Sequence, residues 1–494
     1  MEIDGQTSWS ENAKAYLDKR VTIMFLFGFS AGLPILMIFS SLSLWLREAG
    51  VKRGAVTYFS WAALGYSFKF IWAPLVDKLP IPILTNLLGR RKSWLLFSQF
   101  MIIIAICCMA SVDPSLGGNS LTYMDLAAVI LGFSSATQDI VIDAFRIESA
   151  DASFQAILSS TYIAGYRIAM IVSGAGAIAL AEYLGSTRDH YSYDAWKWSY
   201  FVMAACMLVG VITTFISPEP KLEENNSKHS NREFVHFFLL FLIIASSFVG
   251  MFSITAEIAV SIKVQIQEVV NNKALSGLIV GTLRLMASIS AAGFIAFLIG
   301  KSGLVNTEMV KEGYLSPIQN FFDRYGKKMA ILLLTLIGLY RISDIVLGVI
   351  SNVFYLDLNF TKTQIASVVK TFGLVMSLIG GFLGGLLTTR FGVIRLLFWG
   401  AILSSATNLL FMLLAKMGNN LPMLYLVISA DNLAAGLASA AFVAFLSSLT
   451  DISFTAVQYA IFTSLMTLLP KVMGGYSGSM VDALGYPIFF AMTA

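Results

Sequence analysis

The chain has 494 residues, of which 57% are hydrophobic and 13% are charged, and its formal net charge at pH 7 is +4. Because a soluble domain of this size carries about 25% charged residues, this composition excludes a soluble enzyme. Apolar runs of roughly 20 residues recur along the whole length, which indicates a helical protein that crosses a membrane many times.

The N-terminal segment 1–20 is polar and lacks the order of basic, apolar and small residues that marks a signal peptide. Lysines and arginines gather in alternate loops, whereas the segment 111–124 has none. The positive-inside rule therefore predicts a cytoplasmic N-terminus. The basic residues of these loops are Lys19, Arg20, Lys78, Arg90, Arg91, Lys92, Lys221, Lys228 and Arg232.

Apolar runs predict an N-terminal half of six helices within residues 21–217. The predicted helices cover about 21–46, 55–76, 93–111, 122–147, 154–183 and 195–217.

A linker is predicted at 218–328, because its first part, PEPKLEENNSKHSNRE, is too charged to lie in lipid. Two apolar runs inside it, about 234–256 and 275–300, predict an inserted helix pair joined by the mixed segment 257–274. The linker ends with SPIQNFFDRYGKK (316–328), where phenylalanines alternate with charges. This pattern predicts a helix that lies on the membrane surface.

The C-terminal half is predicted within residues 329–494. Its predicted helices cover about 329–353, 364–389, 394–416, 422–449 and 455–477. The last run, PIFFAMTA from Pro487, would rise only about 12 Å as a helix, which is less than the roughly 30 Å of a bilayer core. The last helix is therefore expected to be incomplete.

The two halves resemble each other at corresponding places. The segments SGAGAIALAEYLG (173–185) and MGGYSGSMVDALG (473–485) align without gaps. After the second helix of each half, APLVDK and GRRK of the first half correspond to GLLTTRFG (385–392) of the second. Parallel six-helix halves joined by a charged loop are the layout of major facilitator transporters, which bind substrate between the halves near the midplane. The expected fold is therefore an all-α major facilitator fold with an inserted helix pair.

Several ionisable residues lie inside the predicted spans, where they cost several kcal/mol and usually mark a transport pathway. Asp139 and Asp143 share one helical face, and Arg146 follows three residues after Asp143. Asp139 has no neutralising partner on its own helix, and an unpaired buried carboxylate can carry a proton near neutral pH. Asp139 is therefore the candidate for proton coupling, with Lys69 at a similar depth.

Other charges near the cytoplasmic ends predict ion pairs that close a gate. Asp143 is expected to pair with Arg146, and Asp77 with the basic cluster that follows it. The predicted gate residues are Asp77, Arg90, Arg91, Asp143 and Arg146.

The buried cations leave two roles open. Arg167, Arg341 and Lys370 could bind a carboxylate of a substrate or could form structural ion pairs, and Asp344 lies at a depth that would let it pair with Lys370. Tyr162 and Tyr166 stand one turn apart beside Arg167 and are candidates for stacking on sugar rings. The glycine pairs Gly28/Gly32 and Gly380/Gly384 indicate close helix packing without any ligand.

Several segments resemble the AmpG muropeptide permeases of Gram-negative bacteria, and together they cover both halves. They are FGFSAGLPILM (27–37), FKFIWAPLVDK (68–78), GRRKSWLL (89–96), SATQDIVIDAF (135–145), GYRIAMIVSG (165–174) and AVQYAIFTSL (456–465). The resemblance implies proton symport of N-acetylglucosaminyl-1,6-anhydro-N-acetylmuramic acid, with or without its stem peptide, across the bacterial inner membrane into the cytoplasm. This import serves cell-wall recycling and controls the induction of β-lactamase.

The resemblance also implies roles for individual residues. It assigns the helix-four motif to Gln138, Asp139 and Asp143 and the helix-five motif to Tyr166 and Arg167. It assigns a basic–acidic pair to Arg341 and Asp344, a lysine to Lys370 and an acid–amide pair to Asp431 and Asn432. Proton coupling is thus expected of Asp139, Asp344 and Arg167. Substrate binding is expected of Gln138, Tyr162, Tyr166, Arg167, Lys69, Arg341, Lys370, Asp431 and Asn432.

The chain departs from the family at the inserted helix pair, since some relatives carry extra helices after the last helix instead. Neither metal-ligand spacing nor a Walker-type phosphate motif occurs in the sequence. The expected partners are therefore the substrate, protons and lipid, with no cofactor, metal or nucleic acid, and the chain is expected to act as a monomer. Two other functions stay open: a related carrier of another bulky anion, such as a cofactor or acyl-CoA-like molecule, and a membrane sensor that binds the ligand without transport.

Overall fold

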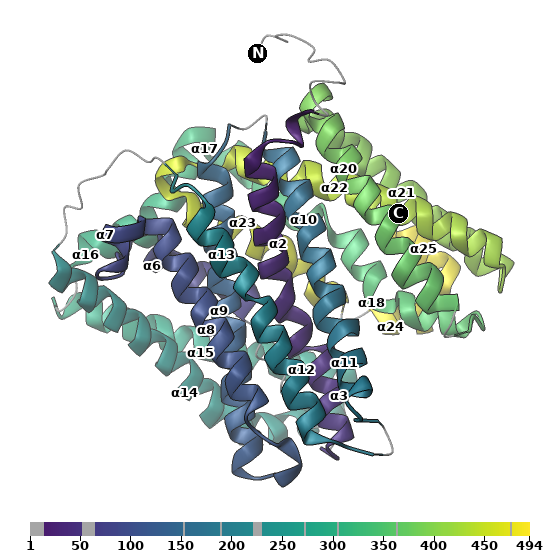
Figure 1. Cartoon of the computed structure of the whole chain (residues 1–494), viewed down its shortest axis with the longest axis horizontal. Helices are drawn as coiled ribbons and strands as arrows, with labels where there is room; N and C mark the ends of the chain where they lie inside the picture. The colour runs from purple at the N-terminus through teal and green to yellow at the C-terminus, as the bar shows by residue number, and fades with distance from the viewer. Residues whose placement is uncertain are drawn as a thin grey trace. The chain divides into compact units, whose positions relative to one another are not determined.

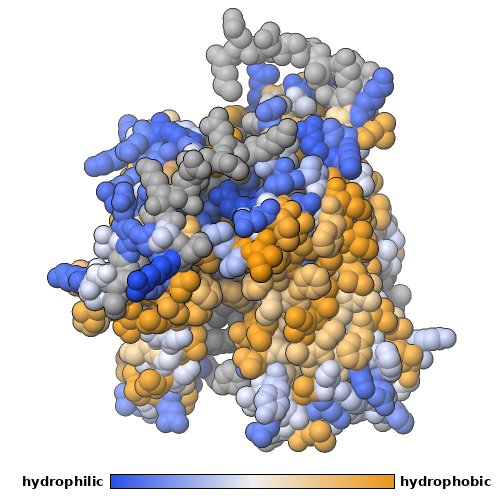
Figure 2. Space-filling model, turned by 60° about the vertical axis from the view of Figure 1, so that its left-hand side comes forward, coloured by the Kyte–Doolittle hydropathy of each residue, from blue (hydrophilic) through white to orange (hydrophobic). Residues whose placement is uncertain are grey.

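The computed structural model describes residues 14–51, 65–151, 154–187, 190–220, 230–270, 273–303, 306–361, 364–474 and 477–494. Over these ranges all regular elements are helices (Figure 1), and eleven of the described helices are long and apolar enough to cross a membrane. Figure 2 shows a broad apolar surface with hydrophilic residues gathered at its two ends, as expected where the loops meet water. The polytopic architecture expected from hydropathy is therefore present.

The chain forms two compact units, Met1–Leu222 together with Phe321–Ala494, and Glu223–Asn320. The first unit contains both predicted halves, and the second lies within the predicted linker. Most basic residues of the first unit lie at one end of its helices, which we call the basic end. Residues that mark the basic end are Arg20, Arg91, Arg146 and Arg390.

The N-terminal half follows the predicted runs, and the first ten residues of the second run, 55–64, lie outside the described residues. Its helices are α2 (Lys19–Ile38), α3 (Ser40–Glu48), α5 (Gly65–Phe68), η2 (Lys69–Ile71), α6 (Ala73–Lys78), α7 (Leu84–Leu88), α8 (Arg90–Ala110), η3 (Pro114–Leu116), α9 (Asn119–Glu148), α10 (Gln155–Ile171), η4 (Val172–Gly176), α11 (Ala177–Tyr183), α12 (Tyr193–Cys206) and α13 (Leu208–Ile216).

The C-terminal half begins within α17 (Ser316–Leu339), which bends at Gly326, where φ is 71°. The remaining helices are α18 (Ile342–Asp357), η6 (Ile365–Phe372), α20 (Gly373–Phe391), α21 (Val393–Met417), α22 (Leu421–Leu449), η7 (Ile452–Phe454), α23 (Thr455–Gly474), α24 (Ser477–Leu484) and α25 (Tyr486–Thr493). The bend separates the predicted surface segment from the following span. Its Phe321 is buried against Phe462, so this side chain packs on protein rather than on lipid.

The internal repeat is visible in the backbone. Gly89 and Gly392 precede α8 and α21 with φ of 89° and 87°, and Gly185 and Gly485 both have positive φ after α11 and α24. Because a side chain is disfavoured at such φ values, glycine is needed at the same turn in each half. The sequence echoes therefore mark equivalent turns of a duplicated fold.

Glycines also set the closest helix contacts. A Cβ added to Gly28 or Gly32 of α2 would collide with the backbone of Tyr162 or Tyr166 of α10. A Cβ added to Gly380 of α20 would collide with Leu433 of α22. These contacts fit the predicted packing role, and they hold α10 and α22, which carry several candidate site residues, against their neighbours.

The second unit contains α14 (Asn231–Val270), α15 (Lys273–Lys301), α16 (Thr307–Val310) and η5 (Lys311–Leu315). The predicted pair is present, but α14 continues through most of the segment 257–274. No glycine or proline occurs between residues 251 and 270 to end the helix. Within this unit, Arg284 of α15 donates to the carbonyl of Phe252 on α14 at 2.9 Å, which joins the two helices.

Candidate functional site

A cluster of four charged side chains lies inside the N-terminal half, and we call it the N-half cluster. It consists of Lys69 on η2 and Asp139, Asp143 and Arg146 on α9. The Lys69 Nζ lies 3.6 Å from Asp143 Oδ2, and the Arg146 Nη2 lies 3.5 Å from Asp143 Oδ1. The Asp143–Arg146 pair expected from sequence is therefore present, but Lys69 shares the same carboxylate.

Asp139 lies one turn away and is 9% exposed. Its nearest charged neighbours are Lys69 and Asp143, and Tyr162 of α10 faces its carboxylate. One carboxylate oxygen, Oδ1, is buried without a hydrogen-bond partner. Among the described residues no cation lies within ion-pair distance of Asp139, because the Lys69 ammonium is turned to Asp143.

Arg146 joins the N-half cluster to the other half. Its side chain is fully buried, and Nη1 donates to Ser447 Oγ of α22 at 2.8 Å. The same nitrogen donates to Gln155 and Ser159 of α10, and the guanidinium lies over the ring of Tyr459 on α23, 5.2 Å from its centroid. Opening the halves at this end would separate a buried cation from these partners.

A second network, the basic-end network, joins the halves through Asp77 of α6. The Arg91 Nη2 lies 2.8 Å from Asp77 Oδ1 and 2.5 Å from Glu148 Oε1. The Asp77 carboxylate also accepts the backbone N–H groups of Ala456 and Val457 at the start of α23, at 3.4 and 3.2 Å. A carboxylate at a helix N-terminus is stabilised by the unpaired N–H groups and the helix dipole.

Arg90 reinforces this network by donating to the Asp77 carbonyl at 2.6 Å. The sequence did not point to Glu148 or to Glu219, which accepts the N–H groups of Arg91 and Lys92 at 2.7 and 3.0 Å. Burial raises the pKa of Glu219 above its ordinary value. The only sequence signal for Glu219 is its position between two prolines directly after the last apolar run of the half.

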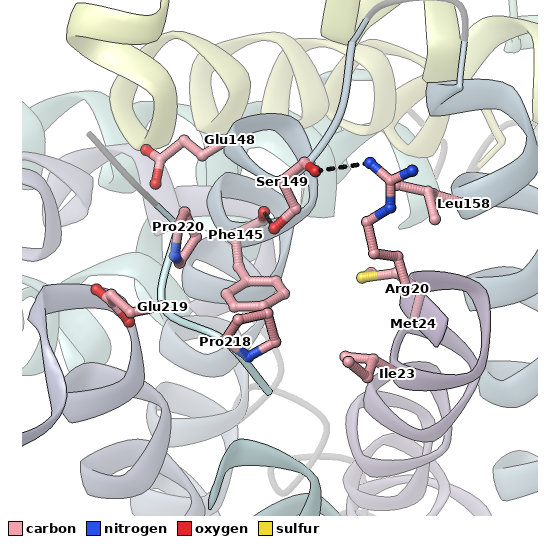
Figure 3. Close-up of a pocket in the computed structure, with 10 residues that line it drawn as sticks. All are labelled: Arg20, Ile23, Met24, Phe145, Glu148, Ser149, Leu158, Pro218, Glu219 and Pro220. Atoms are coloured by element: carbon pink, nitrogen blue, oxygen red, sulfur yellow. Dashed lines mark hydrogen bonds between the residues drawn. The ribbon is translucent and has the colours of Figure 1, made fainter. Parts of the chain in front are cut away.

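Figure 3 shows a pocket of about 330 Å³ beside this network, with Glu148 and Glu219 on one side and Arg20 on the other. Arg20 donates to the carbonyl of Ser149 at 3.3 Å and pairs with Asp18 at 2.9 Å. All of the charged side chains that line the pocket therefore have partners, and the pocket belongs to the packing of the basic end.

Arg167 of α10 and Arg341, which precedes α18, come from different halves, and each is the other's charged neighbour. Arg167 is partly buried and has no carboxylate within ion-pair distance in the described part of the chain. Tyr162 and Tyr166 lie on the same helix as Arg167, with ring centroids 6.1 Å apart. Helix α10 thus carries two aromatic rings and a cation that interacts electrostatically with a cation of the other half.

A second cluster, the C-half cluster, consists of Arg341, Asp344 and Asp431. The Arg341 Nε lies 3.3 Å from Asp344 Oδ2, and Arg341 Nη1 donates to Ser439 Oγ at 2.5 Å. Asp344 also accepts from Ser404 at 2.6 Å. Asp431 of α22 accepts from Thr407 of α21 at 3.3 Å and lies next to Asp344.

The basic–acidic pair Arg341 and Asp344, which the resemblance implies, is present, whereas the alternative pairing of Asp344 with Lys370 is not, because Lys370 is exposed on the π-helical segment η6. Two further site residues lie in the packing of the helices. Gln138 is fully buried and accepts from Ser30 of α2 at 3.0 Å, so it lies in the packing inside the N-terminal half. Asn432 donates to the carbonyl of Ile428 on its own helix at 3.0 Å. A role in substrate binding stays a prediction for these side chains.

Residues 21–309 match the model of the Major Facilitator Superfamily. A Rickettsia conorii protein described as "Putative transporter AmpG 4" is 29% identical over 480 residues, covering 97% of this chain and 94% of that protein. The "Anhydromuropeptide permease" of Escherichia coli K12 is 26% identical over 482 residues, covering 97% of this chain and 78% of that protein.

Solved structures show the same fold. The proton:xylose symporter XylE aligns with a TM-score of 0.54 at 14% identity, covering 97% of this chain and 94% of that one. FucP in its outward conformation aligns with a TM-score of 0.57 at 12% identity, covering 97% and 96%. The chain therefore belongs to the Major Facilitator Superfamily, so it is a multi-pass membrane transporter and not an enzyme, and it is similar over most of its length to proteins described as AmpG transporters and anhydromuropeptide permeases.

Proposed function

We propose that this transporter imports anhydro-muropeptides, the disaccharide GlcNAc-1,6-anhydroMurNAc with or without its stem peptide, from periplasm to cytoplasm by proton symport. The observation that carries the proposal is the pair Arg167 and Arg341, two cations from different halves that interact electrostatically, with Tyr162 and Tyr166 on the helix of Arg167. Guanidinium groups bind carboxylates, and the neighbouring rings of Tyr162 and Tyr166 offer flat faces for sugars. A sugar acid fits both features, and the E. coli relative is named for such a substrate.

The proposed orientation places the basic end in the cytoplasm and the protein in the bacterial inner membrane, because basic loops stay on the cytoplasmic side. The contacts between Arg146 and Ser447 and between Asp77 and Val457 join the halves at the basic end. In this orientation the structure is closed toward the cytoplasm, the state that would receive substrate from the periplasm. The unit of transport is proposed to be a monomer.

Proton coupling is proposed to act through Asp139. Its carboxylate is the member of the N-half cluster without an ion-pair partner among the described residues. Binding a proton there removes a buried charge, whereas Asp143 keeps two cations in either state. Protonation of Asp139 therefore changes the charge of the interior beside Tyr162 without breaking the contacts that Arg146 makes with the other half.

Alternating access then requires the basic-end contacts to break after substrate binds. Opening the cytoplasmic side would remove Asp77 from the start of α23 and Arg146 from Ser447. Arg91 would keep its ion pairs with Asp77 and Glu148, because all three residues belong to the N-terminal half. The basic-end network is thus able to move as one body with α6 and α9.

Uptake of labelled anhydro-disaccharide into proteoliposomes, with and without an inward proton gradient, tests this function. Wild-type protein is expected to accumulate the disaccharide only with the gradient, and Asp139→Asn is expected to take up fewer protons per substrate. The matched control is Asp125→Asn, an exposed carboxylate on the same helix, which is expected to behave as wild type. Uptake that ignores the gradient, or wild-type coupling in Asp139→Asn, would contradict the proposal.

The same assay separates the other two candidate functions. Competition by an acyl-CoA-like anion but not by muropeptides would identify a carrier of another bulky anion, which the two arginines would also suit. Binding of the disaccharide without accumulation would identify a sensor.

A further inference from the structure

The carboxylate of Asp431 has no ion-pair partner among the described residues of the C-terminal half. It lies ten residues into α22, about 15 Å from the end of that helix opposite the basic end. Its side chain is partly buried and accepts a hydrogen bond from Thr407 Oγ1 at 3.3 Å. A hydroxyl stabilises a carboxylate far less than a cation does.

The groups that face Asp431 come from the helices packed against α22. Helix α18 and its preceding residue contribute Asp344, Arg341 and the phenol of Tyr355, and α21 contributes the Thr407 hydroxyl. From η6 the nearest lysine, Lys370, is exposed and makes no ion pair with a described carboxylate. Among the described residues, the charged groups that act on Asp431 are Asp344 and Arg341.

The C-half cluster differs from the N-half cluster in its balance of cations and carboxylates. The N-half cluster has two cations and two carboxylates, whereas the C-half cluster has Arg341 alone against Asp344 and Asp431. Asp344 takes the ion pair with Arg341 and the hydrogen bond from Ser404. Asp431 is therefore the surplus negative charge, and an uncompensated buried charge costs several kcal/mol.

We propose that Asp431 is a second proton-binding site, so that each transport cycle carries two protons, one at Asp139 and one at Asp431. This inference rests on the proposed function. A proton from the periplasmic solution forms an O–H bond on the Asp431 carboxylate and is released to the cytoplasm after the conformational change. With Asp431 neutral, Arg341 has a single carboxylate neighbour left and presents more positive charge to a substrate anion beside Arg167.

The charge carried in each cycle tests the stoichiometry. The anhydro-disaccharide has one carboxylate, on its lactyl group, so symport with one proton moves no net charge and symport with two protons moves one positive charge inward. Currents are recorded from proteoliposomes on a solid-supported membrane after addition of the disaccharide, and labelled uptake is measured in the same preparation. Wild-type protein is expected to give an inward current and uptake that an inside-negative potential accelerates.

Asp431→Asn is expected to move no net charge per labelled disaccharide taken up and to lose the response to potential. Asp139→Asn is expected to lose the current in the same way, and the double variant to lose all dependence on the proton gradient. Asp125→Asn serves as the matched control and keeps the current. Asp431→Glu, which restores a carboxylate, is expected to recover at least part of it and guards against a folding defect.

Two results would overturn the inference while leaving the proposed function intact. One is electroneutral, proton-driven uptake by the wild type. The other is a wild-type current in folded Asp431→Asn. Uptake by the wild type that ignores the proton gradient altogether would instead contradict the proposed function itself.

Discussion

The charged clusters of the two halves differ in how their charges are balanced and in what they join. The N-half cluster pairs Asp143 with two cations, and its Arg146 reaches across to Ser447 of the other half. The C-half cluster has one cation for two acids, and Arg341 donates to Ser439 of its own half. A duplicated fold has thus placed a contact between the halves in one copy and a surplus carboxylate in the other. Both clusters thus contain a carboxylate without an ion-pair partner among the described residues, but only the N-half cluster is also tied to the contact between the halves.

The largest expected effect comes from Arg146→Ala. Because this side chain is fully buried and donates to three residues, its loss is expected to destabilise the protein by about 3–5 kcal/mol. Denaturant titration of the purified protein in detergent measures this loss in the free energy of unfolding. Arg341→Ala is the matched comparison, since the Arg341 side chain is 22% exposed and should cost less. Equal losses for the two variants would remove the distinction between the clusters.

A smaller effect is expected from Gly380→Ala. A Cβ at this position would collide with Leu433, two residues from Asp431, so α20 must move away from α22. Overpacking of this kind costs about 1–3 kcal/mol. Gly381→Ala is the matched control, because a Cβ there would meet no atom within 4 Å. If both substitutions reduce the melting temperature equally, close packing of α20 on α22 is not what holds the C-half cluster in position.

Arg341→Gln tests substrate binding in the C-half cluster. Losing one charge-assisted contact to a carboxylate is expected to raise the half-saturation concentration for the disaccharide about tenfold, which corresponds to about 1.4 kcal/mol. Ser439→Ala, which removes only the hydrogen bond to Arg341, is expected to have a smaller effect. An unchanged half-saturation concentration in Arg341→Gln would assign Arg341 a purely structural role.

The smallest effect concerns the basic-end network. Because burial raises the pKa of Glu219 in the folded protein, the folded state binds this proton more tightly than the unfolded chain does. Its contribution to stability therefore falls as pH rises through the window between the ordinary glutamate pKa and the raised value. Glu219→Gln is expected to flatten this pH dependence by less than about 1 kcal/mol. Melting temperatures measured from pH 4 to 7 would contradict this if the two proteins show the same slope.

Much of the fold follows from local sequence. Runs of apolar residues predict the spans, since a helix in lipid must satisfy its own backbone and present apolar side chains. The repeated glycines predict equivalent turns, and Gly89 and Gly392 share nearly the same φ. The extension of α14 through residue 270 was harder to predict, because its mixed polar and apolar residues contain no signal that ends a helix.

Some contacts of the site residues also follow from local sequence, whereas others depend on how the helices pack. Helical spacing on one element was enough to predict the Asp143–Arg146 pair, because positions three residues apart share a helix face. The Arg341–Asp344 pair has the same three-residue spacing. The sharing of Asp143 with Lys69 and the burial of Gln138 depend instead on how helices are rotated and packed. No pattern within a single helix specifies that rotation.

The sequence by itself determined that this protein is a membrane-spanning bundle of two related halves with ionisable residues in its interior, because hydropathy, repeats and charge are properties of local segments. Only the tertiary structure decided which of these charges are balanced. Asp139 and Asp431 stand without a cation within ion-pair distance among the described residues, because Lys69 of another element pairs with Asp143 and Arg341 pairs with Asp344. Electrostatic energy depends on distances between side chains that lie far apart in the chain, and only the folded arrangement supplies those distances.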